Sequence, residues 1–308
     1  MMVKRKKGLL QRCREHWQLL LFMLPPMIYL IIFKYIPMFG IQLAFKKFQI
    51  AKGIWGSPWV GFYNFQKFFQ SFYFERVLRN TLTVSFYSLI AGFPLPIIIA
   101  LSLNVIERGR FKKAVETILY MPHFISTVVL VGILFQILNI RIGIYGTIFR
   151  SITGHNPVDI LASAKSFVHL YVWSGIWQNM GWDTIIYTAA LSSVDPELHE
   201  AAQIDGANRF QRVINIDLPC ILPTAAILLI MSCGHIMSIG FEKVYIMQND
   251  ANLVYSEVIS TYSYKVGLSG QADFGRSTAI SLFNSIINMC MLLFVNQITK
   301  RLNSTSLF

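Results

Sequence analysis

The apolar stretch 166–192 carries side chains that could bind a polar ligand. Its central part reads WSGIWQNMGWDTIIY and brings indole rings, two amides and a carboxylate close together. Polar groups inside a membrane span are costly and tend to mark a functional pathway. Sugars bind through this combination, because their C–H faces stack on aromatic rings and their hydroxyls hydrogen-bond amides and carboxylates. The chemistry indicated is the binding of a polyhydroxylated molecule.

A second set of candidate residues lies in the apolar stretch 219–247. Four side chains recur there at i, i+3, i+4 and i+7, and residues with this spacing share one face of a helix. They are Ser232, His235, Ile236 and Ile239. An alternative applies to both stretches, since Ser, Asn and His also hydrogen-bond between membrane helices and these side chains could serve packing instead.

Asp183, within the first stretch, has two open interpretations. It could form an ion pair with Lys34 or Lys243, or it could bind hydroxyls of a substrate. Lys243 and its neighbour Glu242 lie near the end of the second stretch. There they form either a contact at a transport gate or a pair at the membrane interface.

The acids of the chain cluster in the polar stretch 195–219, whose pattern predicts two short helices separated by a bend. Asp195 is a favourable N-cap and Pro196 a favourable first helical residue. Two glutamates follow in the first turns, where the helix dipole favours negative charge. Gly206 can end this helix in a left-handed conformation, and a second short helix covers 208–215. A connector needs less built-in order, so we interpret the stretch as a docking element rather than an ordinary loop.

The composition indicates an integral membrane protein. Of 308 residues, 54% are hydrophobic and only 14% are charged, and the mean hydropathy is +0.51. A soluble domain carries about 25% charged residues. The formal net charge is +12, and its densest cluster, Lys4 to Lys7 with Arg12 and Arg14, precedes the first apolar run. Such a cluster is typical of a cytoplasmic flank attracted to anionic lipid headgroups, rather than of a nucleic-acid-binding surface.

Six apolar segments are long enough to cross a membrane as helices, which takes about 20 residues. They are 17–40, 79–105, 116–140, 166–192, 219–247 and 277–299. A membrane barrel is not indicated, because its strands would alternate polar and apolar residues. We therefore predict an all-α membrane protein with a basic N-terminal segment, 1–16, and one six-span domain, 17–308.

Lysine and arginine are denser on one side of this predicted topology, the side that includes the N-terminal cluster. Cytoplasmic flanks carry such an excess, so both termini and the loop 193–218 are predicted to face the cytoplasm. The four cysteines form no CxxC pair, and no GxxxxGK[ST] phosphate-binding loop occurs. We expect no catalytic residue, metal or cofactor on this chain, and any ATP would be hydrolysed by a partner.

The docking stretch also resembles a known motif. Its spacing, EAA-x3-G-x9-I-x-LP from Glu200 to Pro219, is similar to the EAA motif of bacterial ABC-importer permeases, and 205–207 match the DGA often found within it. The segments LPPMIYLIIFKYIPMFG, WVGFYNFQKFF, YMPHFIS and GFEKVYIM resemble carbohydrate-uptake permeases. They are most similar to the branch that imports oligosaccharides cut from complex polysaccharides. The resemblance extends over nearly the whole chain.

This resemblance implies a type I ABC-importer permease core of six helices, with a cytoplasmic coupling helix that docks on the ATPase and transmits its closure. The docking residues implied are Glu200, Ala201, Ala202, Asp205, Gly206, Ala207, Leu218 and Pro219. The implied partners are a second homologous permease, two nucleotide-binding ATPase subunits that hold ATP and Mg, an extracytoplasmic solute-binding protein, an oligosaccharide and membrane lipid, with no nucleic acid. The implied location is the bacterial inner membrane.

The same resemblance implies a substrate cavity at the membrane midplane, where the two sets of candidate residues meet. The lining implied is Trp177, Gln178, Asn179, Trp182, Asp183, Ser232, His235, Ile236 and Ile239. Basic side chains toward the predicted outer side favour an anionic oligosaccharide, such as one that contains uronate. These side chains are Lys34, Lys243, Lys265 and Arg276.

Two other classes of function fit the sequence less well. A secondary transporter driven by an ion gradient predicts more intramembrane carboxylates and inverted halves, whereas only Asp183 lies deep within a predicted span and no internal repeat is visible. A membrane enzyme acting on a lipid-linked sugar would need clustered acids or metal ligands at the interface. The acids cluster only in the docking stretch.

Overall fold

The computed structural model describes residues 17–106, 109–269 and 272–303, so the predicted basic segment 1–16 lies outside the described residues. Within these ranges nearly every element is a helix, and the extended pairing amounts to one isolated antiparallel bridge. The prediction of an all-α architecture is confirmed.

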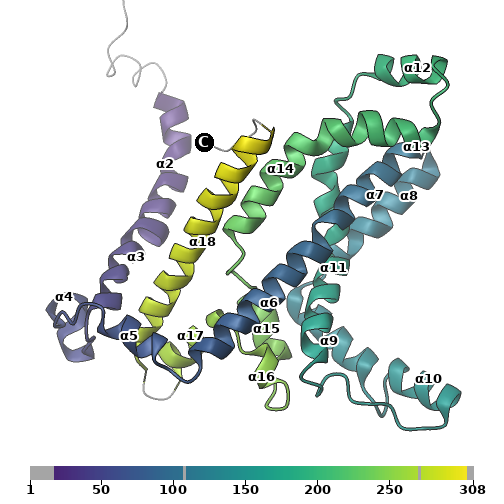
Figure 1. The fold of residues 1–308 in the computed structure, drawn as a ribbon. Coiled ribbons are helices and arrows are strands. Elements are labelled where there is room, and N and C mark those ends of the chain that lie inside the picture. Colours follow the sequence, from purple (N-terminus) through teal and green to yellow (C-terminus); the bar gives the residue numbers. More distant parts are fainter. Residues whose placement is uncertain (1–16, 107–108, 270–271, 304–308) are drawn as a thin grey trace, which may run out of the picture.

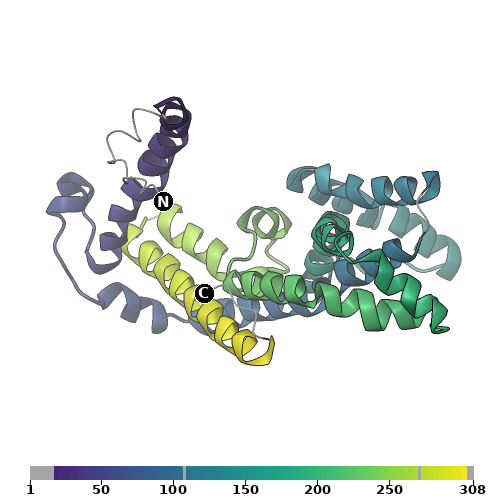
Figure 2. The same ribbon diagram turned by 90° about the horizontal axis from the view of Figure 1, so that it is seen from above.

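The first span is one apolar path of 29 residues, Trp17–Phe45, whose helical geometry changes along its length. Its parts are α2 (Trp17–Leu30), η1 (Ile31–Tyr35), α3 (Ile36–Met38) and η2 (Phe39–Phe45). No residue of α2 is buried, and this helix stands away from the others in both views of the chain (Figures 1 and 2). The apolar side chains of α2 are therefore left to face lipid or another chain.

The centre of the molecule is α11 (Ser166–Leu191), a helix of 26 residues. It packs against α6 (Phe74–Gly92), α7 (Pro94–Val105) and α14 (Leu218–Gly234). Together, α6 and α7 make one apolar path of 32 residues. These helices enclose the space in which the candidate ligand residues meet.

The remaining long helices pack around this centre. The path into α14 starts with α13 (Arg209–Arg212) and η5 (Val213–Asp217), and α18 (Phe274–Asn303) packs along α14 and α17 (Ile259–Leu268). The short elements of the connections are η3 (Ile50–Lys52), α4 (Gly53–Gly56), α5 (Tyr63–Phe69), α10 (Ile144–Thr153) and α16 (Leu253–Ser256).

The predicted span 116–140 is not one straight helix. It consists of α8 (Arg110–Tyr120) and η4 (Met121–Phe124), followed by α9 (Thr127–Leu138) at an angle of 98°. Ser126 starts the new helix, because its backbone is extended and its Oγ accepts a hydrogen bond from a backbone N–H in the first turn of α9. The few polar residues at the bend lie inside a long apolar stretch, so hydropathy alone did not reveal it.

The predicted span 219–247 is also interrupted. Its helix α14 ends at Gly234, and α15 (Phe241–Met247) begins after a non-helical stretch. A Cβ at Gly234 would lie 2.6 Å from the side chain of Leu292, so the end of α14 presses closely on α18. Among the described residues four helices are long and apolar enough to cross a membrane, or five with the bent pair. The more polar α11 is not one of them, and the count of six spans stays a prediction.

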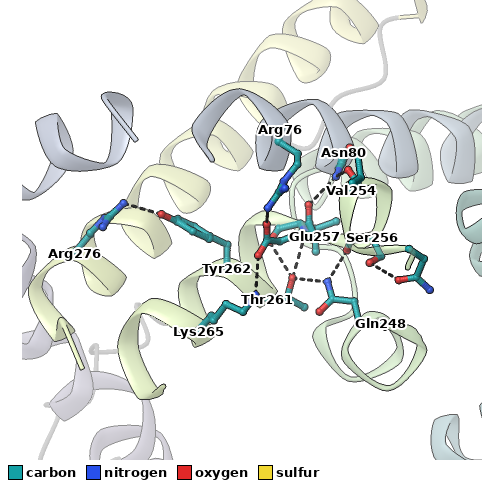
Figure 3. Close-up of polar contacts among 12 residues, drawn as sticks. Arg76, Asn80, Gln248, Val254, Ser256, Glu257, Thr261, Tyr262, Lys265 and Arg276 are labelled. Atoms are coloured by element: carbon teal, nitrogen blue, oxygen red, sulfur yellow. Dashed lines mark hydrogen bonds and ion pairs between the residues drawn. The ribbon is translucent and has the colours of Figure 1, made fainter. Parts of the chain in front are cut away.

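A buried carboxylate ties α6 to the start of α17 (Figure 3). The side chain of Glu257 is only 3% exposed and accepts hydrogen bonds from Arg76 and from Lys265, whose Nζ lies 3.2 Å from Oε1. Arg76 also lies over the ring of Tyr73, 4.9 Å from its centroid. Asn80, on the same helix, donates to the backbone carbonyl of Glu257 at 3.0 Å. These groups are costly to leave unpaired, so they anchor two segments that are distant in the sequence.

Replacing Arg76 by Met should destabilise the protein more than replacing Lys265 by Met. The first change leaves a buried carboxylate with one cation fewer and costs about 2–3 kcal/mol. Lys265 has a side chain that is 55% exposed, and its pair contributes about 1 kcal/mol or less. Thermal unfolding of both variants in nanodiscs, followed by tryptophan fluorescence, compares their Tm values. Equal shifts in Tm would contradict an anchoring role for the Arg76 pair.

Candidate functional site

A cavity of about 490 Å³ lies between the central helices. One wall comes from α6 and α7, a second from α11, and a third from α14 with the non-helical stretch that follows it. Small-ligand sites usually enclose roughly 300–1,000 Å³. The cavity therefore has the size of a site for a small ligand or for part of a longer one.

Most of the candidate ligand residues line this cavity. They are Gln178, Asn179, Asp183, Ser232, His235, Ile236 and Ile239. Trp177 and Trp182 lie outside its lining, with exposed fractions of 46% and 43%. Trp182 instead stacks on His123, with ring centroids 4.4 Å apart. Neighbouring residues of a helix point about 100° apart, so an indole beside a lining amide faces another side.

The two amides of α11 also hold the bent third segment in place. Gln178 Nε2 donates to the carbonyl of Ile125 at 2.7 Å, at the point where η4 has ended and α9 has not begun. Asn179 Nδ2 donates to the carbonyl of Gly175 at 3.0 Å, and its Oδ1 lies 3.0 Å from Nδ1 of His123. Lining of the cavity and packing between helices are therefore compatible roles for the same side chains.

Sequence reasoning missed the wall that the second span contributes. Ser85, Ser88 and Gly92 line the cavity at i, i+3 and i+7, and this spacing of small residues in an apolar run was a detectable signal. Tyr171 and Lys243 line it as well. Nothing in their spacing indicates this, because they come from separate segments that only the fold brings together.

Neither of the ion pairs considered for Asp183 is present among the described residues. Lys243 instead donates from Nζ to the carbonyl of Tyr171 at 2.9 Å, and Lys34 lies exposed on the first span. The ion-pair interpretation was therefore wrong. The other interpretation, in which the carboxylate of Asp183 meets substrate hydroxyls, stays a prediction.

Most of the stretch 195–219 folds locally as the sequence predicts. Asp195 caps α12 (Pro196–Ile204) by accepting a hydrogen bond from a backbone N–H of its first turn at 3.0 Å. Gly206 has a φ of +81°, in the left-handed region that favours glycine. A capping box then begins α13, in which the side-chain oxygens of Asn208 and Gln211 each accept a hydrogen bond from the backbone N–H of the other residue. The helix and the glycine bend are confirmed. The second helix is not a separate short element, because α13 and η5 run on without a break into α14. The docking role of the stretch stays a prediction.

The helix α12 projects from one end of the molecule, at the upper right of Figure 1. The predicted docking residues Glu200, Ala201, Asp205 and Gly206 are exposed, Ala202 and Ala207 are half-buried, and Leu218 and Pro219 begin α14. Two large apolar side chains of α12 are also exposed, Leu198 at 51% and Ile204 at 87%. An exposed apolar pair among small residues is a surface that another protein can cover closely.

Asp217 joins α12 to the helix bundle. Its side chain is 3% exposed, accepts from Asn104 Nδ2 at 3.1 Å and lies 3.2 Å from Nε2 of His199 on α12. A second cavity, of about 990 Å³, lies beneath α12 between the ends of α7, α8 and α13. One buried carboxylate therefore connects the projecting helix with the second span and with the start of α14.

Residues 92–304 match the family described as the inner membrane component of binding-protein-dependent transport systems. The chain belongs to this family. The matched region includes both central helices of the cavity, α11 and α14, and the whole stretch 195–219. The predicted permease subunit, a membrane component rather than an enzyme, is confirmed by this match and by the relatives that follow.

The most informative relatives match the chain over almost its whole length. Protein LplB of Bacillus subtilis (strain 168) is 39% identical over 96% of this chain and 92% of its own. The polygalacturonan/rhamnogalacturonan transport system permease protein YteP of the same organism is 37% identical over 99% of this chain and 94% of its own. A chain 38% identical, in the crystal structure of a bacterial alginate ABC transporter in complex with alginate pentasaccharide-bound periplasmic protein, matches with a TM-score of 0.88 over 98% of this chain and 100% of its own. The predicted resemblance to carbohydrate-uptake ABC permeases is confirmed.

Replacing Asp217 by Ala should loosen α12, because Asn104 and His199 both lose their acceptor. We expect amide hydrogens of α12 to exchange about five- to tenfold faster, which corresponds to about 1 kcal/mol of local stability. Hydrogen–deuterium exchange followed by mass spectrometry measures this on α12 peptides. Glu197→Gln, at an exposed acid of the same helix, is the matched control. Unchanged exchange in the Asp217 variant would contradict the connection.

Proposed function

We propose that this chain is the permease subunit of an ATP-driven importer for an acidic oligosaccharide, and that α12 with its glycine bend docks on a separate ATPase subunit. The observation that carries this proposal is the continuity of α11. Its middle lines the central cavity, and it ends at Leu191, shortly before the N-cap of α12 at Asp195. One rigid helix thus connects the ligand cavity with the docking surface.

A displacement of α12 reaches the cavity by two routes. The first is α11 itself. The second is Asp217, which holds α12 through His199 and begins α14, the helix that carries Ser232 at the cavity. Coupling requires an element with two arrangements that both sites bias, and the pair of α11 and α14 is that element. Closure of the ATPase dimer would rock the two helices and open the cavity to alternate sides of the membrane.

The cavity chemistry supports a carbohydrate ligand. Amides and hydroxyls from three helices surround it, among them Gln178, Asn179, Ser85 and Ser232, and such groups both donate to and accept from sugar hydroxyls. The acidic character rests on the relatives. YteP is a permease for polygalacturonan and rhamnogalacturonan, and a second solved structure, of a transporter 38% identical to this chain, concerns import of the acidic polysaccharide alginate.

The partners proposed are a second homologous permease, two ATPase subunits that bind ATP and Mg, and an extracytoplasmic solute-binding protein. The alginate transporter in which this fold recurs was crystallised with its periplasmic protein. The exposed apolar surface of α2 is suited to a sister permease or to lipid. In the bacterial inner membrane, both termini and α12 would face the cytoplasm.

The docking role can be tested at Gly206. A Cβ at this position would meet no atom within 4 Å, so substitutions act chiefly through backbone strain at φ +81°. Asn tolerates this left-handed conformation, whereas β-branched Val does not. Gly206→Val should therefore distort the bend, and Gly206→Asn is the matched control that keeps it.

The measurement is ATPase retained by complexes purified through a tag on this chain, after co-expression with its sister permease and the ATPase subunit. Wild type and Gly206→Asn should retain the ATPase subunit and its coupled hydrolysis. Gly206→Val should retain about tenfold less ATPase activity. If all three forms retain the same ATPase activity, the bend takes no part in docking. If no form retains an ATPase, transport driven by an ion gradient becomes the better explanation.

The acidic substrate has its own test. Proteoliposomes that contain the complete transporter and its binding protein should take up trigalacturonate about tenfold faster than the carboxyl-reduced trisaccharide. Radiolabelled uptake with ATP inside the vesicles measures both rates. Faster uptake of the neutral sugar would refute an acidic substrate while leaving the importer assignment in place.

A further inference from the structure

We propose that Lys243 is the residue that binds a carboxylate of the substrate in the central cavity, and that Gly175 provides the space for its ammonium group. This inference rests on the proposed function, which it deepens by assigning the recognition of acidic sugars to one side chain. Of the basic residues that favoured an anionic ligand, Lys34 lies exposed on the first span, Lys265 pairs with Glu257, and Arg276 donates to Tyr262 at 2.6 Å. Lys243 is the one of these four that lines the cavity.

The surroundings of Lys243 leave its charge incompletely compensated. The residue is only 8% exposed, its Nζ donates to the carbonyl of Tyr171 at 2.9 Å, and it lies over the Tyr171 ring at 4.8 Å from the centroid. An ammonium group carries three donors, and one carbonyl uses one of them. In the part of the chain that the structure describes, no carboxylate is within ion-pair distance of Nζ. A buried cation of this kind is stabilised when an anion completes its shell.

Gly175 explains how the ammonium group reaches the cavity surface. A Cβ at this position would lie 3.2 Å from Nζ of Lys243, so an alanine would shift the ammonium by a few tenths of an ångström. Glycine within a helix costs roughly 0.5–1 kcal/mol relative to alanine, so its presence in the middle of α11 calls for a local reason. The close approach of Nζ is that reason.

The two charges that line the cavity are separated along α11. Nζ of Lys243 lies beside Tyr171 and Gly175, whereas Asp183 is just over two turns further toward α12, about 12 Å by the rise of the helix. A carboxylate of the ligand would therefore bind at the end of the cavity far from α12. The amides of Gln178 and Asn179 lie between the two charges and face the uncharged parts of the sugar.

A lysine suits this task in a transporter. A charge-assisted hydrogen bond is roughly twice as strong as a neutral one, which favours an acidic sugar over its neutral counterpart. The ammonium is a point charge on a flexible stem rather than a bidentate clamp, so it holds a carboxylate without fixing one geometry. A site on a transport pathway must bind well enough to admit its ligand and weakly enough to release it.

The test uses the complete complex of this chain, its sister permease and the ATPase subunits in nanodiscs, without the binding protein. Calorimetric titration measures the Kd of trigalacturonate and of the carboxyl-reduced trisaccharide. Lys243→Met, which keeps the length of the side chain and removes the charge, should raise the Kd of trigalacturonate about tenfold or more and leave that of the neutral sugar unchanged. Lys243→Arg should restore most of the preference.

Two further variants complete the design. Gly175→Ala should raise the Kd of trigalacturonate but not that of the neutral sugar, because its methyl group displaces Nζ. Lys47→Met, at an exposed lysine of the first connection, should change neither Kd. Retention of the ATPase by each variant confirms that the complex is assembled.

The possible outcomes separate this inference from the proposed function. If Lys243→Met raises the Kd of both sugars equally, the residue has a structural role and the inference is overturned. If wild type prefers trigalacturonate and Lys243→Met keeps that preference, another group binds the carboxylate and the inference alone fails. If wild type shows no preference, the acidic substrate itself is refuted.

Discussion

The pairing of polar groups inside an apolar helix bundle is the constraint on which the rest of this structure depends. Amides and carbonyls without partners are costly in such surroundings. The middle of α11 meets this constraint by crossing to its neighbours, through Gln178 to the carbonyl of Ile125 and through Asn179 to His123. These bonds secure the bend between η4 and α9. The same amides of α11 therefore contact the bent segment and line the cavity.

The helix α11 also connects the cavity with the projecting helix α12. Its middle lines the cavity and its end leads into α12, so one continuous helix joins the cavity to the exposed helix. Asp217 adds a second connection, from α12 to the start of α14. Two helices that share a cavity wall are thus both attached to the element that projects from the bundle.

Two buried charged side chains differ in how fully their charge is compensated. Glu257 is surrounded by Arg76 and Lys265, and this compensated cluster holds α6 against the start of α17. Lys243 meets a carbonyl and the face of an aromatic ring, and its ammonium borders a cavity. The first arrangement is complete without a ligand. The second leaves donors of the ammonium group unused beside the cavity, and this difference is the basis for proposing that Lys243 binds a ligand.

Local features were predictable from the sequence. The long apolar runs indicated membrane helices, because burial of every backbone hydrogen bond within the helix is required there. Asp195, Pro196 and Gly206 predicted the helix and bend of the docking stretch, since capping and left-handed geometry depend on neighbours a few residues away. The spacing of the EAA motif indicated the family. Ser232, His235, Ile236 and Ile239 line the cavity, but not as one face of a helix, because α14 ends at Gly234 and the last three lie in the non-helical stretch after it.

Features that depend on contacts between distant segments were decided only by the tertiary structure. The bend within 116–140 and the break after Gly234 did not stand out by hydropathy, because each lies inside a long, mostly apolar stretch. Trp177 and Trp182 lie in the same sequence segment as the lining amides, yet in the packed helix α11 they lie outside the cavity lining. The sequence by itself determined that this is a helical membrane protein with an ordered loop at 195–219, since those properties follow from composition and short-range pattern. Its resemblance to a known motif indicated the permease family. Which side chains meet in the cavity, Lys243 and Gly175 among them, depended on how separate helices press together, and no single segment contains that information.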